Sequence, residues 1–346
     1  MTFAELSEQL YQELKILETY RKYCSQLILK PEETVAENWK EFVQISGEII
    51  NIFHKTQDDS QNELYTNLVQ GLYGQINYQD IIYQLSEKTQ EYIIQYKSRL
   101  HRCNVCGSEV YYAPLPRYYE EQRIKYGARK TISETLNSEE YICPFCGSVD
   151  RDRLIVGYLQ KKQLLQKGKK ILQIAPAKAI DTYIKSNAEV IYETTDLFME
   201  GVTYRTDIQA MKGIADDTYD VWICSHVLEH VPDDRKALSE LKRILKPNGI
   251  GILLVPLDLS REETDEEVGC SEEENWRRFG QGDHVRAYAK KDFLKRVEEA
   301  GFQLNALGKE YFGEEMFREA GLLDTSTLYI VHKKGFNDKA DQLINR

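Results

Sequence analysis

Apolar and polar positions over residues 170–334 alternate between strand-like and helix-like spacing. Asp220–Ser225 is a short apolar run of the kind found in a buried parallel strand, and Ile250–Val255 is a second such run. Between them, Pro232-Asp-Asp opens a helical pattern that Pro247-Asn-Gly ends. Strand, helix and strand within roughly forty residues form a βαβ unit, whose ligands bind at the carboxyl ends of the strands. We therefore expect a binding site just after the first of these strands.

The same alternation extends on both sides of this unit. Before it, the pattern predicts a helix, a strand, a second helix and a second strand, over Leu154–Leu165, Ile171–Ile174, Ile180–Ser186 and Val190–Thr195. After it, the pattern predicts a helix and two strands, over Lys290–Ala300, Phe302–Leu307 and Thr327–His332. This order is typical of an α/β fold with a mainly parallel sheet. We expect the last two strands to form an antiparallel pair at the end of the sheet.

The first hundred residues have a different pattern, with three glycines and one proline and leucines at helical spacing at positions 6, 10, 14 and 17. They predict an α-helical N-terminal region of perhaps four helices. We expect such a bundle to pack on the rest of the chain or on a second subunit. In the second case the protein would be a homo-oligomer. Recognition of a substrate is the alternative role.

Residues 101–150 contain two copies of the turn Cys-x-x-Cys-Gly-Ser, which the first hundred residues lack. The first contains Cys103 and Cys106, and the second contains Cys143 and Cys146. In each turn two thiolates converge, and four sulfurs complete the tetrahedral shell of a structural Zn²⁺ ion. All four positions would be filled by protein, so we expect no catalytic role for this zinc. A ribbon without metal and a redox dithiol are the alternatives.

Bulk composition narrows the class of protein. The 346 residues carry a formal net charge of −11, which argues against a nonspecific nucleic-acid binder, since such proteins need a positive surface. No apolar run is long enough to cross a membrane, and the N-terminus has no basic segment followed by an apolar one. Cysteines in Cys-x-x-Cys pairs then indicate metal binding under reducing conditions. We expect a cytoplasmic protein that does not bind membranes.

Carboxylates follow the expected strands at positions that suit a nucleoside. Asp196 lies roughly twenty residues past the tip of the first strand, where nucleotide-binding α/β sheets place an acid on the ribose hydroxyls. Asp207, at the end of the third strand, could accept the amino group of an adenine. The alternative for each is a loop cap. A polar cluster follows the strand 220–225 and consists of Ser225, His226, Glu229 and His230.

Residues 170–334 resemble a class I S-adenosylmethionine-dependent methyltransferase domain of the broad-range type 11 kind. The resemblance is carried by Ile171–Pro176, Tyr192–Leu197, Asp207-Ile208, Asp220–His230 and the string Leu-Lys-Arg-Ile-Leu-Lys-Pro-Asn-Gly at 241–249. A Cys-Pro-x-Cys-Gly-Ser ribbon followed by Asp-Arg-Asp-Arg-Leu looks like a bacterial subgroup in which a ribbon directly precedes this domain. The implied fold is a Rossmann-like seven-stranded methyltransferase sheet, preceded by a small zinc ribbon and the α-helical region.

The resemblance also implies which residues hold the cofactor S-adenosylmethionine. They are Gln173, Ala175, Pro176, Asp196, Asp207, Ile208, Ser225 and His226. One departure concerns the loop after the first strand, which is glycine-rich in the family and reads Ala-Pro-Ala-Lys-Ala at 175–179 here. The subgroup with the ribbon tends to have Ala-Pro there too. Side-chain Cβ atoms and the missing proline NH limit how closely a ligand can approach.

The stretch Trp276–Tyr288 is dense in residues that bind polar or anionic groups. We expect substrate contacts from Arg278, Gln281, Arg286 and Tyr288, with a structural hydrogen-bond network as the alternative. Histidine titrates near neutral pH, so we predict His284 first, and His226 second, as a general base. The spacing of His226 and His230 would also suit a metal on a helix face, but no third ligand stands out in the sequence.

The predicted organisation is a helical region over 1–100, a zinc ribbon over 101–150, a methyltransferase domain over 151–334 and a tail over 335–346. The predicted activity is transfer of a methyl group from S-adenosylmethionine to a small-molecule or glycan-precursor acceptor, by in-line displacement. Two alternatives stay open. One is methylation of RNA or protein with the ribbon gripping the polymer, and the other is a catalytically silent scaffold with the same fold.

Overall fold

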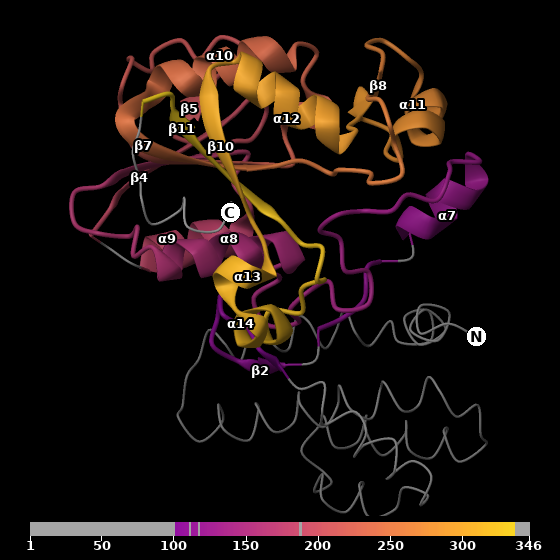
Figure 1. Ribbon diagram of the computed structural model, residues 1–346, viewed down its shortest axis with the longest axis horizontal. Helices are drawn as coiled ribbons and strands as arrows, with labels where there is room; N and C mark the ends of the chain where they lie inside the picture. The colour runs from indigo at the N-terminus through magenta and orange to yellow at the C-terminus, as the bar shows by residue number, and fades with distance from the viewer. Residues whose placement is uncertain (1–100, 111, 117, 187–188, 336–346) are drawn as a thin grey trace, which may run out of the picture. The chain divides into compact units, whose positions relative to one another are not determined.

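A computed structural model describes residues 101–110, 112–116, 118–186 and 189–335 (Figure 1). The helices expected over residues 1–100 and all but the first residue of the expected tail lie outside the described residues. The chain divides into two compact units. The first comprises Met1–Cys103, Gly107–Arg117 and Ser138–Phe145, and the second comprises Asn104–Cys106, Tyr118–Asn137 and Cys146–Arg346.

The described part of the first unit contains a small antiparallel pair of strands. Strand β1 (His101–Arg102) pairs with β2 (Glu109–Val110). A tight turn joins them, in which the Gly107 amide donates to the carbonyl of Cys103 at 2.7 Å. Gly107 has a φ of 76°, a left-handed conformation that glycine adopts without steric cost. The glycine after the Cys-x-x-Cys pair therefore serves the turn that the sequence predicts.

The second unit contains a seven-stranded sheet with the order β10-β11-β7-β6-β3-β4-β5. Its strands are β3 (Lys170–Ile174), β4 (Ile191–Asp196), β5 (Tyr204–Arg205), β6 (Tyr219–Ser225), β7 (Leu245–Leu254), β10 (Phe302–Leu307) and β11 (Leu328–Lys333). Six strands run in one direction, and β11 alone among the seven is antiparallel, to both β7 and β10. The expected antiparallel pair at the end of the sheet is confirmed.

Helices cover both faces of this sheet (Figure 1). On one face lie α10 (Asp234–Ile244) and α12 (Lys290–Glu299), which pack with Trp222 and Leu172 of the sheet. On the other lie α8 (Asp150–Lys161), α9 (Lys178–Ser186), α13 (Lys309–Phe312) and α14 (Glu314–Glu319), which pack with Ile171 and Val221. Neighbouring strand residues thus point to opposite faces, and both faces are buried, as parallel sheets require.

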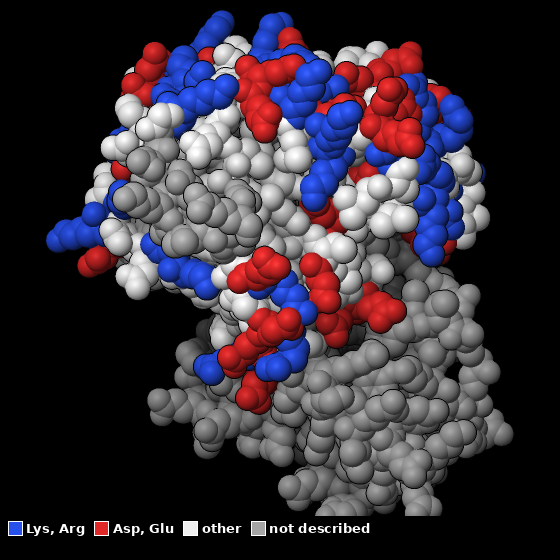
Figure 2. Space-filling model, in the orientation of Figure 1, with Lys and Arg blue, Asp and Glu red and all other residues white. Residues whose placement is uncertain are grey.

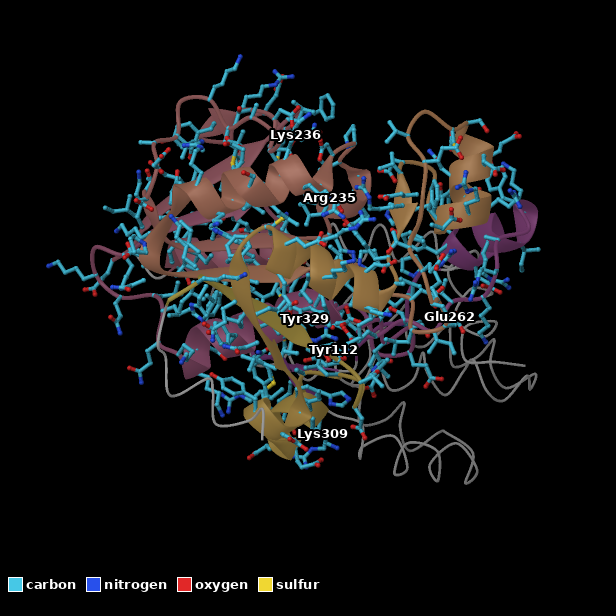
Figure 3. The ribbon with its side chains drawn as sticks, turned by 45° about the horizontal axis from the view of Figure 1, so that its top comes forward. Tyr112, Arg235, Lys236, Glu262, Lys309 and Tyr329 are labelled. Carbon is cyan, nitrogen blue, oxygen red and sulfur yellow. The ribbon has the colours of Figure 1, made fainter. Side chains whose placement is uncertain are left out.

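The outer side of α10 is charged, whereas the sheet centre is apolar. In Figure 3, Arg235 and Lys236 lie on the exposed side of α10, and Tyr329 of β11 lies within the molecule. Arg235 reaches Glu299 of α12 at 2.5 Å. Basic and acidic side chains are interspersed over the α10 and α12 face in Figure 2. Among the described residues, no helix has both the length and the apolar content that crossing a bilayer takes.

A lobe formed by residues 258–288 and α7 (Tyr118–Lys125) extends from the carboxyl end of the sheet. It contains β8 (Asp265–Glu266), which pairs antiparallel with β9 (Arg286–Ala287), and α11 (Glu272–Phe279). The indole of Trp276 packs against the rings of Tyr118 and Tyr126, at centroid distances of 6.0 and 6.1 Å. A one-turn 3-10 helix, η1 (Leu228–His230), faces this lobe from the end of β6.

Two predicted elements begin four or more residues earlier in the structure, and helix α11 was not predicted. The helix expected from Leu154 begins at Asp150, because two aspartates in its first turn favour a helix N-terminus and Asp152 accepts a bond from the Val149 amide. The strand expected from Ile250 begins at Leu245, which pairs with Tyr219 across a bulge. The third difference is α11, for which no helix is predicted between the strand ending at Val255 and the helix beginning at Lys290.

Candidate functional site

The carboxyl ends of the three central strands meet at one edge of the sheet. The Ala175 amide, just after β3, donates to the carbonyl of Thr195 in β4 at 2.8 Å, and the His226 amide, just after β6, donates to Leu254 of β7 at 2.9 Å. Ala175 and His226 both have left-handed backbones, with φ values of 47° and 55°. Such conformations cost roughly 1–2 kcal/mol for a residue with a Cβ atom, and strained residues of this kind cluster at functional sites. The strand tips are therefore the candidate active site.

Asp196 is held rigidly at the tip of β4. Its Oδ1 accepts hydrogen bonds from the amides of Phe198 and Met199, both at 2.7 Å. Its Oδ2 makes no hydrogen bond to the described residues. The loop-cap role and the ligand role are therefore compatible, because one oxygen orients the carboxylate and the other is available.

Asp207 has a different environment. Its Oδ1 accepts from the Gln209 amide at 2.8 Å, and both of its oxygens contact the Gln209 side-chain nitrogen at 3.1 Å. Gln209 in turn accepts from the amide of Asp233, the N-cap of α10. These contacts favour the cap role for Asp207. The neighbouring Ile208 is a buried member of the core.

Three further residues predicted to bind the cofactor differ in how their polar groups are used. The buried Gln173 accepts a bond from the hydroxyl of Tyr192 at 2.6 Å. The Ser225 hydroxyl, at the tip of β6, is buried and has no hydrogen-bond partner among the described residues. Pro176 has no amide hydrogen to offer a ligand. Since buried polar groups are almost always bonded, the Ser225 hydroxyl suits a polar ligand at this edge.

A buried carboxylate lies among histidines at the end of β6. Glu229 is fully buried, and its Oε1 lies 3.3 Å from Nδ1 of His226 and 3.9 Å from Nε2 of His230. Burial opposes ionisation of Glu229, but the imidazoles of His226 and His284 bring its pKa below the usual range. Partial burial and the charge of Arg151 lower the pKa of His226, so this imidazole is neutral at pH 7.

His284 reaches the same place from the lobe. It is 6% exposed, and its Nδ1 contacts the carbonyl of Phe279 at 3.3 Å. Its ring meets that of His230 edge-on, at a centroid distance of 4.7 Å. Burial lowers the pKa of His284. His230 and His284 are therefore the two histidines whose rings are in contact, and Glu229 lies beside them. The sequence singled out His226 with His230 instead.

The predicted substrate contacts divide into two kinds. Arg286 and Tyr288 are buried, Arg286 donating to the carbonyls of Leu228, Val231 and Pro232, and the Tyr288 hydroxyl donating to Asp234 at 2.6 Å. These contacts favour the structural alternative for both residues. Arg278 pairs with Asp265 and Glu267 inside the lobe, so its charge is also engaged. Gln281 is half-buried.

The cysteine turns bring their thiols together within each unit. Cys103 and Cys143 meet in the first unit, Cys106 and Cys146 meet in the second, and the sulfurs lie within 4.8 Å of one another. Gly147, with a φ of 71°, matches the left-handed glycine of the first turn. The repeated turns predicted from sequence therefore produce a four-cysteine cluster.

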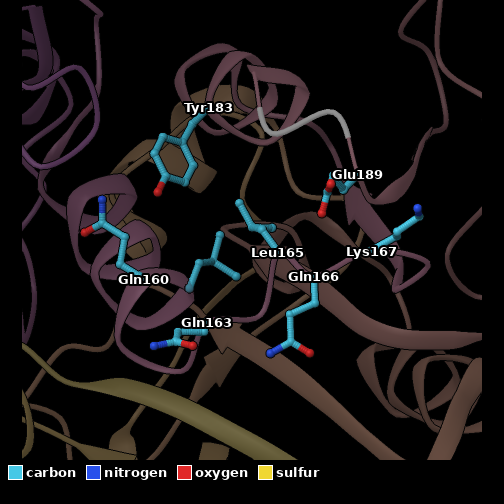
Figure 4. A pocket seen from close by; sticks show the side chains of 8 residues that line it. Gln160, Gln163, Leu165, Gln166, Lys167, Tyr183 and Glu189 are labelled. Carbon is cyan, nitrogen blue, oxygen red and sulfur yellow. The ribbon is translucent and has the colours of Figure 1, made fainter.

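A surface pocket of about 380 Å³ lies away from the strand tips (Figure 4). It is lined by residues of α8, α9 and the segments that precede β3 and β4, including Gln160, Gln163, Tyr183 and Glu189. These segments lie at the amino ends of the strands, opposite the edge where α/β sheets bind ligands. We therefore locate the candidate site at the strand tips.

Comparison with known proteins agrees with the architecture. Residues 161–253 match the model of a family described as "Methyltransferase domain". No curated protein matches the chain. The seven-stranded mixed sheet with helices on both faces matches the Rossmann-like methyltransferase fold, as predicted from the sequence.

Solved structures similar to the chain include three proteins described as methyltransferases that depend on S-adenosylmethionine. One, from Archaeoglobus fulgidus, is 13% identical. The match covers 52% of this chain and 92% of that protein, with a TM-score of 0.33. One from Aquifex aeolicus is 14% identical, with coverages of 53% and 90% and a TM-score of 0.32. One from Mesorhizobium loti is 12% identical, with coverages of 51% and 96% and a TM-score of 0.34. Scores this low carry no argument about activity.

Proposed function

We propose that this protein is an S-adenosylmethionine-dependent methyltransferase that acts on a small-molecule or glycan-precursor acceptor. The observation that carries the proposal is the carboxylate of Asp196, fixed through Oδ1 at the tip of β4 with Oδ2 available. It stands beside the tip of β3, which pairs with β6 on its other side, in a sheet that matches the methyltransferase fold. An acid at this place accepts hydrogen bonds from ribose hydroxyls.

The residues at the strand tips fit this cofactor chemically. Asp196 would hold the ribose, and the unbonded Ser225 hydroxyl would face a polar part of the same molecule. The turn at Ala175 and Pro176 would border the methionine part, with the left-handed φ of Ala175 turning the backbone where the family has glycine. The cofactor supplies a methyl group on a sulfonium, which leaves as a neutral thioether. The chain mainly has to hold the acceptor in line with that methyl group.

A hydroxyl or amine acceptor also needs a group that takes its proton. His226 is the best-placed imidazole, because it follows the tip of β6 and its side chain is 27% exposed. Its Nδ1 faces Glu229, which leaves Nε2 for an acceptor. His284, the first choice from sequence, is almost enclosed and bonded to Phe279. We therefore assign the proton acceptor to His226.

The distribution of charge supports a small acceptor over a nucleic acid. Nucleic-acid binders concentrate lysine and arginine on one face. On the face shown in Figure 2, both signs are interspersed over α10, α12 and the lobe. An arginine of this region such as Arg278 is paired with acids of its own lobe.

Binding of the cofactor is tested by calorimetry on the full-length protein with S-adenosylmethionine and S-adenosylhomocysteine. We expect both to bind, and Asp196→Ala to weaken binding by about 10- to 100-fold, since hydrogen bonds to a charged group contribute roughly 1.5–3 kcal/mol. The matched control is Asp216→Asn, an exposed acid paired with Arg243 before the amino end of β6, which should bind as the wild type does. No binding by the wild type would instead support the silent scaffold. Retention on RNA at physiological salt would support the nucleic-acid alternative.

We also propose that the four-cysteine cluster holds a structural Zn²⁺ ion. Four thiolates suit structural zinc and leave no position open for catalysis. Elemental analysis should find zinc in the purified protein, and Cys143→Ser should release it and unfold the surrounding turns. Retention of the full zinc content by that variant would contradict the assignment.

A further inference from the structure

We propose that Glu229, His230 and His284 bind a divalent transition-metal ion at the end of β6. The ligand atoms of the three residues lie within 4.8 Å of one another, close enough for one ion to reach all of them. The rings of His230 and His284 stand at 85° to each other with centroids 4.7 Å apart. Two imidazoles that approach edge to face in this way can direct one nitrogen each toward a shared point.

Hydrogen bonds fix which nitrogen of each imidazole is available. Nδ1 of His284 lies 3.3 Å from the carbonyl of Phe279, and Nδ1 of His230 lies 3.2 Å from the carbonyl of Asp283. A carbonyl only accepts, so each Nδ1 carries the hydrogen and each Nε2 keeps its lone pair. The Asp283 carboxylate, 3.2 Å from the same nitrogen of His230, strengthens this arrangement. Metal-binding histidines characteristically donate their other N–H to a carbonyl or carboxylate in this way.

Glu229 supplies an independent observation that points to a cation. It is fully buried, and neither of its carboxylate oxygens has a hydrogen-bond partner among the described residues. A buried carboxylate without hydrogen bonds is costly unless a cation compensates it. The only groups of the described residues that stand as ion-pair partners within 4 Å are the imidazoles of His226 and His230.

A second buried glutamate in the same unit shows what a purely structural carboxylate looks like here. Glu134 is 2% exposed, and both of its oxygens accept from the hydroxyl of Tyr329, at 3.0 and 2.8 Å. The ammonium of Lys290 lies 2.7 Å from its Oε1. The fold therefore satisfies one buried glutamate completely and leaves the other facing imidazole nitrogens.

The backbone holds the three side chains in register. Glu229 and His230 lie in the one-turn helix η1, so their relative position is fixed by a tight turn. The amide of Val285, the residue after His284, donates to the carbonyl of Glu229 at 2.9 Å. This bond connects the lobe to η1 at the metal-binding residues themselves. Rigid support of this kind is what a metal site needs.

The donor set defines the class of ion. Two imidazoles and one carboxylate suit Zn²⁺, Fe²⁺, Mn²⁺ or Co²⁺, whereas Mg²⁺ and Ca²⁺ prefer oxygen ligands throughout. Three protein ligands leave coordination positions open, as in catalytic sites. The site adjoins His226 at the strand tip, so an oxygen of the methyl acceptor could fill an open position. This last role rests on the proposed methyl transfer, whereas binding of the ion does not.

The test is a metal titration of the full-length protein, first loaded with a single equivalent of zinc so that only the tighter cysteine cluster is filled. We expect Co²⁺ to bind in addition, with weak visible absorption typical of nitrogen and oxygen ligands and without the near-ultraviolet thiolate band of a cysteine site. Metal analysis after dialysis against Zn²⁺, Fe²⁺ or Mn²⁺ should likewise find one ion beyond that of the cysteines. Absence of any such ion in the folded wild type would overturn the proposal, whatever the cofactor calorimetry shows.

Variants locate the ion. Glu229→Gln keeps the size of the side chain and should weaken binding by more than the roughly 10- to 100-fold that loss of an outer-shell partner costs. Asp283→Asn, which alters only that outer shell, should weaken it within that range. Glu134→Gln is the matched control and should leave binding unchanged. His230→Ala, at a half-buried position, gives a second test should Glu229→Gln fold poorly. Wild-type affinity in both ligand variants would refute the assignment.

Discussion

Two groups of charged residues, buried except for Glu266 and the half-buried His230, lie side by side where the lobe meets the end of β6. In the first, which we call the arginine network, every charged group is bonded; it consists of Asp234, Glu266, Arg286, Tyr288 and Arg296. In the second, Glu229 faces His230 and His284 with no hydrogen bond to either carboxylate oxygen. Only five positions separate Glu229 from Asp234 in the sequence. The difference shows that folding here can satisfy buried ions fully, so the unsatisfied one is best explained by a ligand.

The largest effect should come from removing the centre of the arginine network. Arg286→Met takes the buried donor away from the carbonyls of Val231 and Pro232, whereas Glu266 keeps its two bonds from Arg296. We expect the free energy of unfolding to fall by about 3–5 kcal/mol, because the buried guanidinium also pairs with the buried carboxylate of Asp234 at 3.8 Å. Urea unfolding followed by circular dichroism measures it. Unchanged stability with weakened binding of an acceptor would instead make Arg286 the substrate contact that the sequence suggests.

The same substitution should affect the two buried glutamates differently when metal is added. Glu134→Gln removes the charge that Lys290 pairs with and should lower the free energy of unfolding by about 1–2 kcal/mol, discounted for the partly exposed lysine, with or without added Co²⁺. Glu229→Gln should cost more stability with Co²⁺ added than without it, because only an intact site gains stability from a bound ion. Urea unfolding of both variants beside the wild type, with and without Co²⁺, makes the comparison. A loss of the same size under both conditions would show that Glu229 is a structural anion.

The smallest effect should come from the edge of the arginine network. Tyr288→Phe removes one bond to Asp234, which keeps its 2.7 Å contact with Arg296. We expect a loss of about 0.5–1 kcal/mol in the free energy of unfolding, with no change in metal content. Thermal unfolding and metal analysis together check this. A drop in metal content would mean that the two groups of charges are coupled.

The sequence predicts most of the sheet because buried parallel strands are short continuous apolar runs. Strand β10 has the predicted limits, and β3 and β6 differ by one residue. The start of β7 was missed, because Lys-Pro-Asn-Gly resembles a turn and its pairing depends on a bulge opposite Tyr219. Helix α11 was missed among acidic residues, although Ser271 followed by Glu274 is a capping signal.

The candidate site could be predicted only where chemistry follows a single strand. Asp196 lies at the tip of β4, as its distance from the first strand indicates. The partners of Arg286 and His284 could not be predicted, because both depend on how the lobe folds back onto η1. The sequence shows only that residues 276–288 are rich in polar side chains. The fold shows that Arg286 holds the lobe against η1, whereas His284 lies beside Glu229 and His230.

The bond between the Val285 amide and the Glu229 carbonyl has a mechanical consequence. Together with the bonds from Arg286 to the carbonyls of Leu228, Val231 and Pro232, it ties the inner edge of the lobe to the turn after β6. An outward movement of the lobe would have to break these bonds. We therefore expect the lobe to stay in place, and the proposed methyl transfer to proceed without a slow opening step on this side.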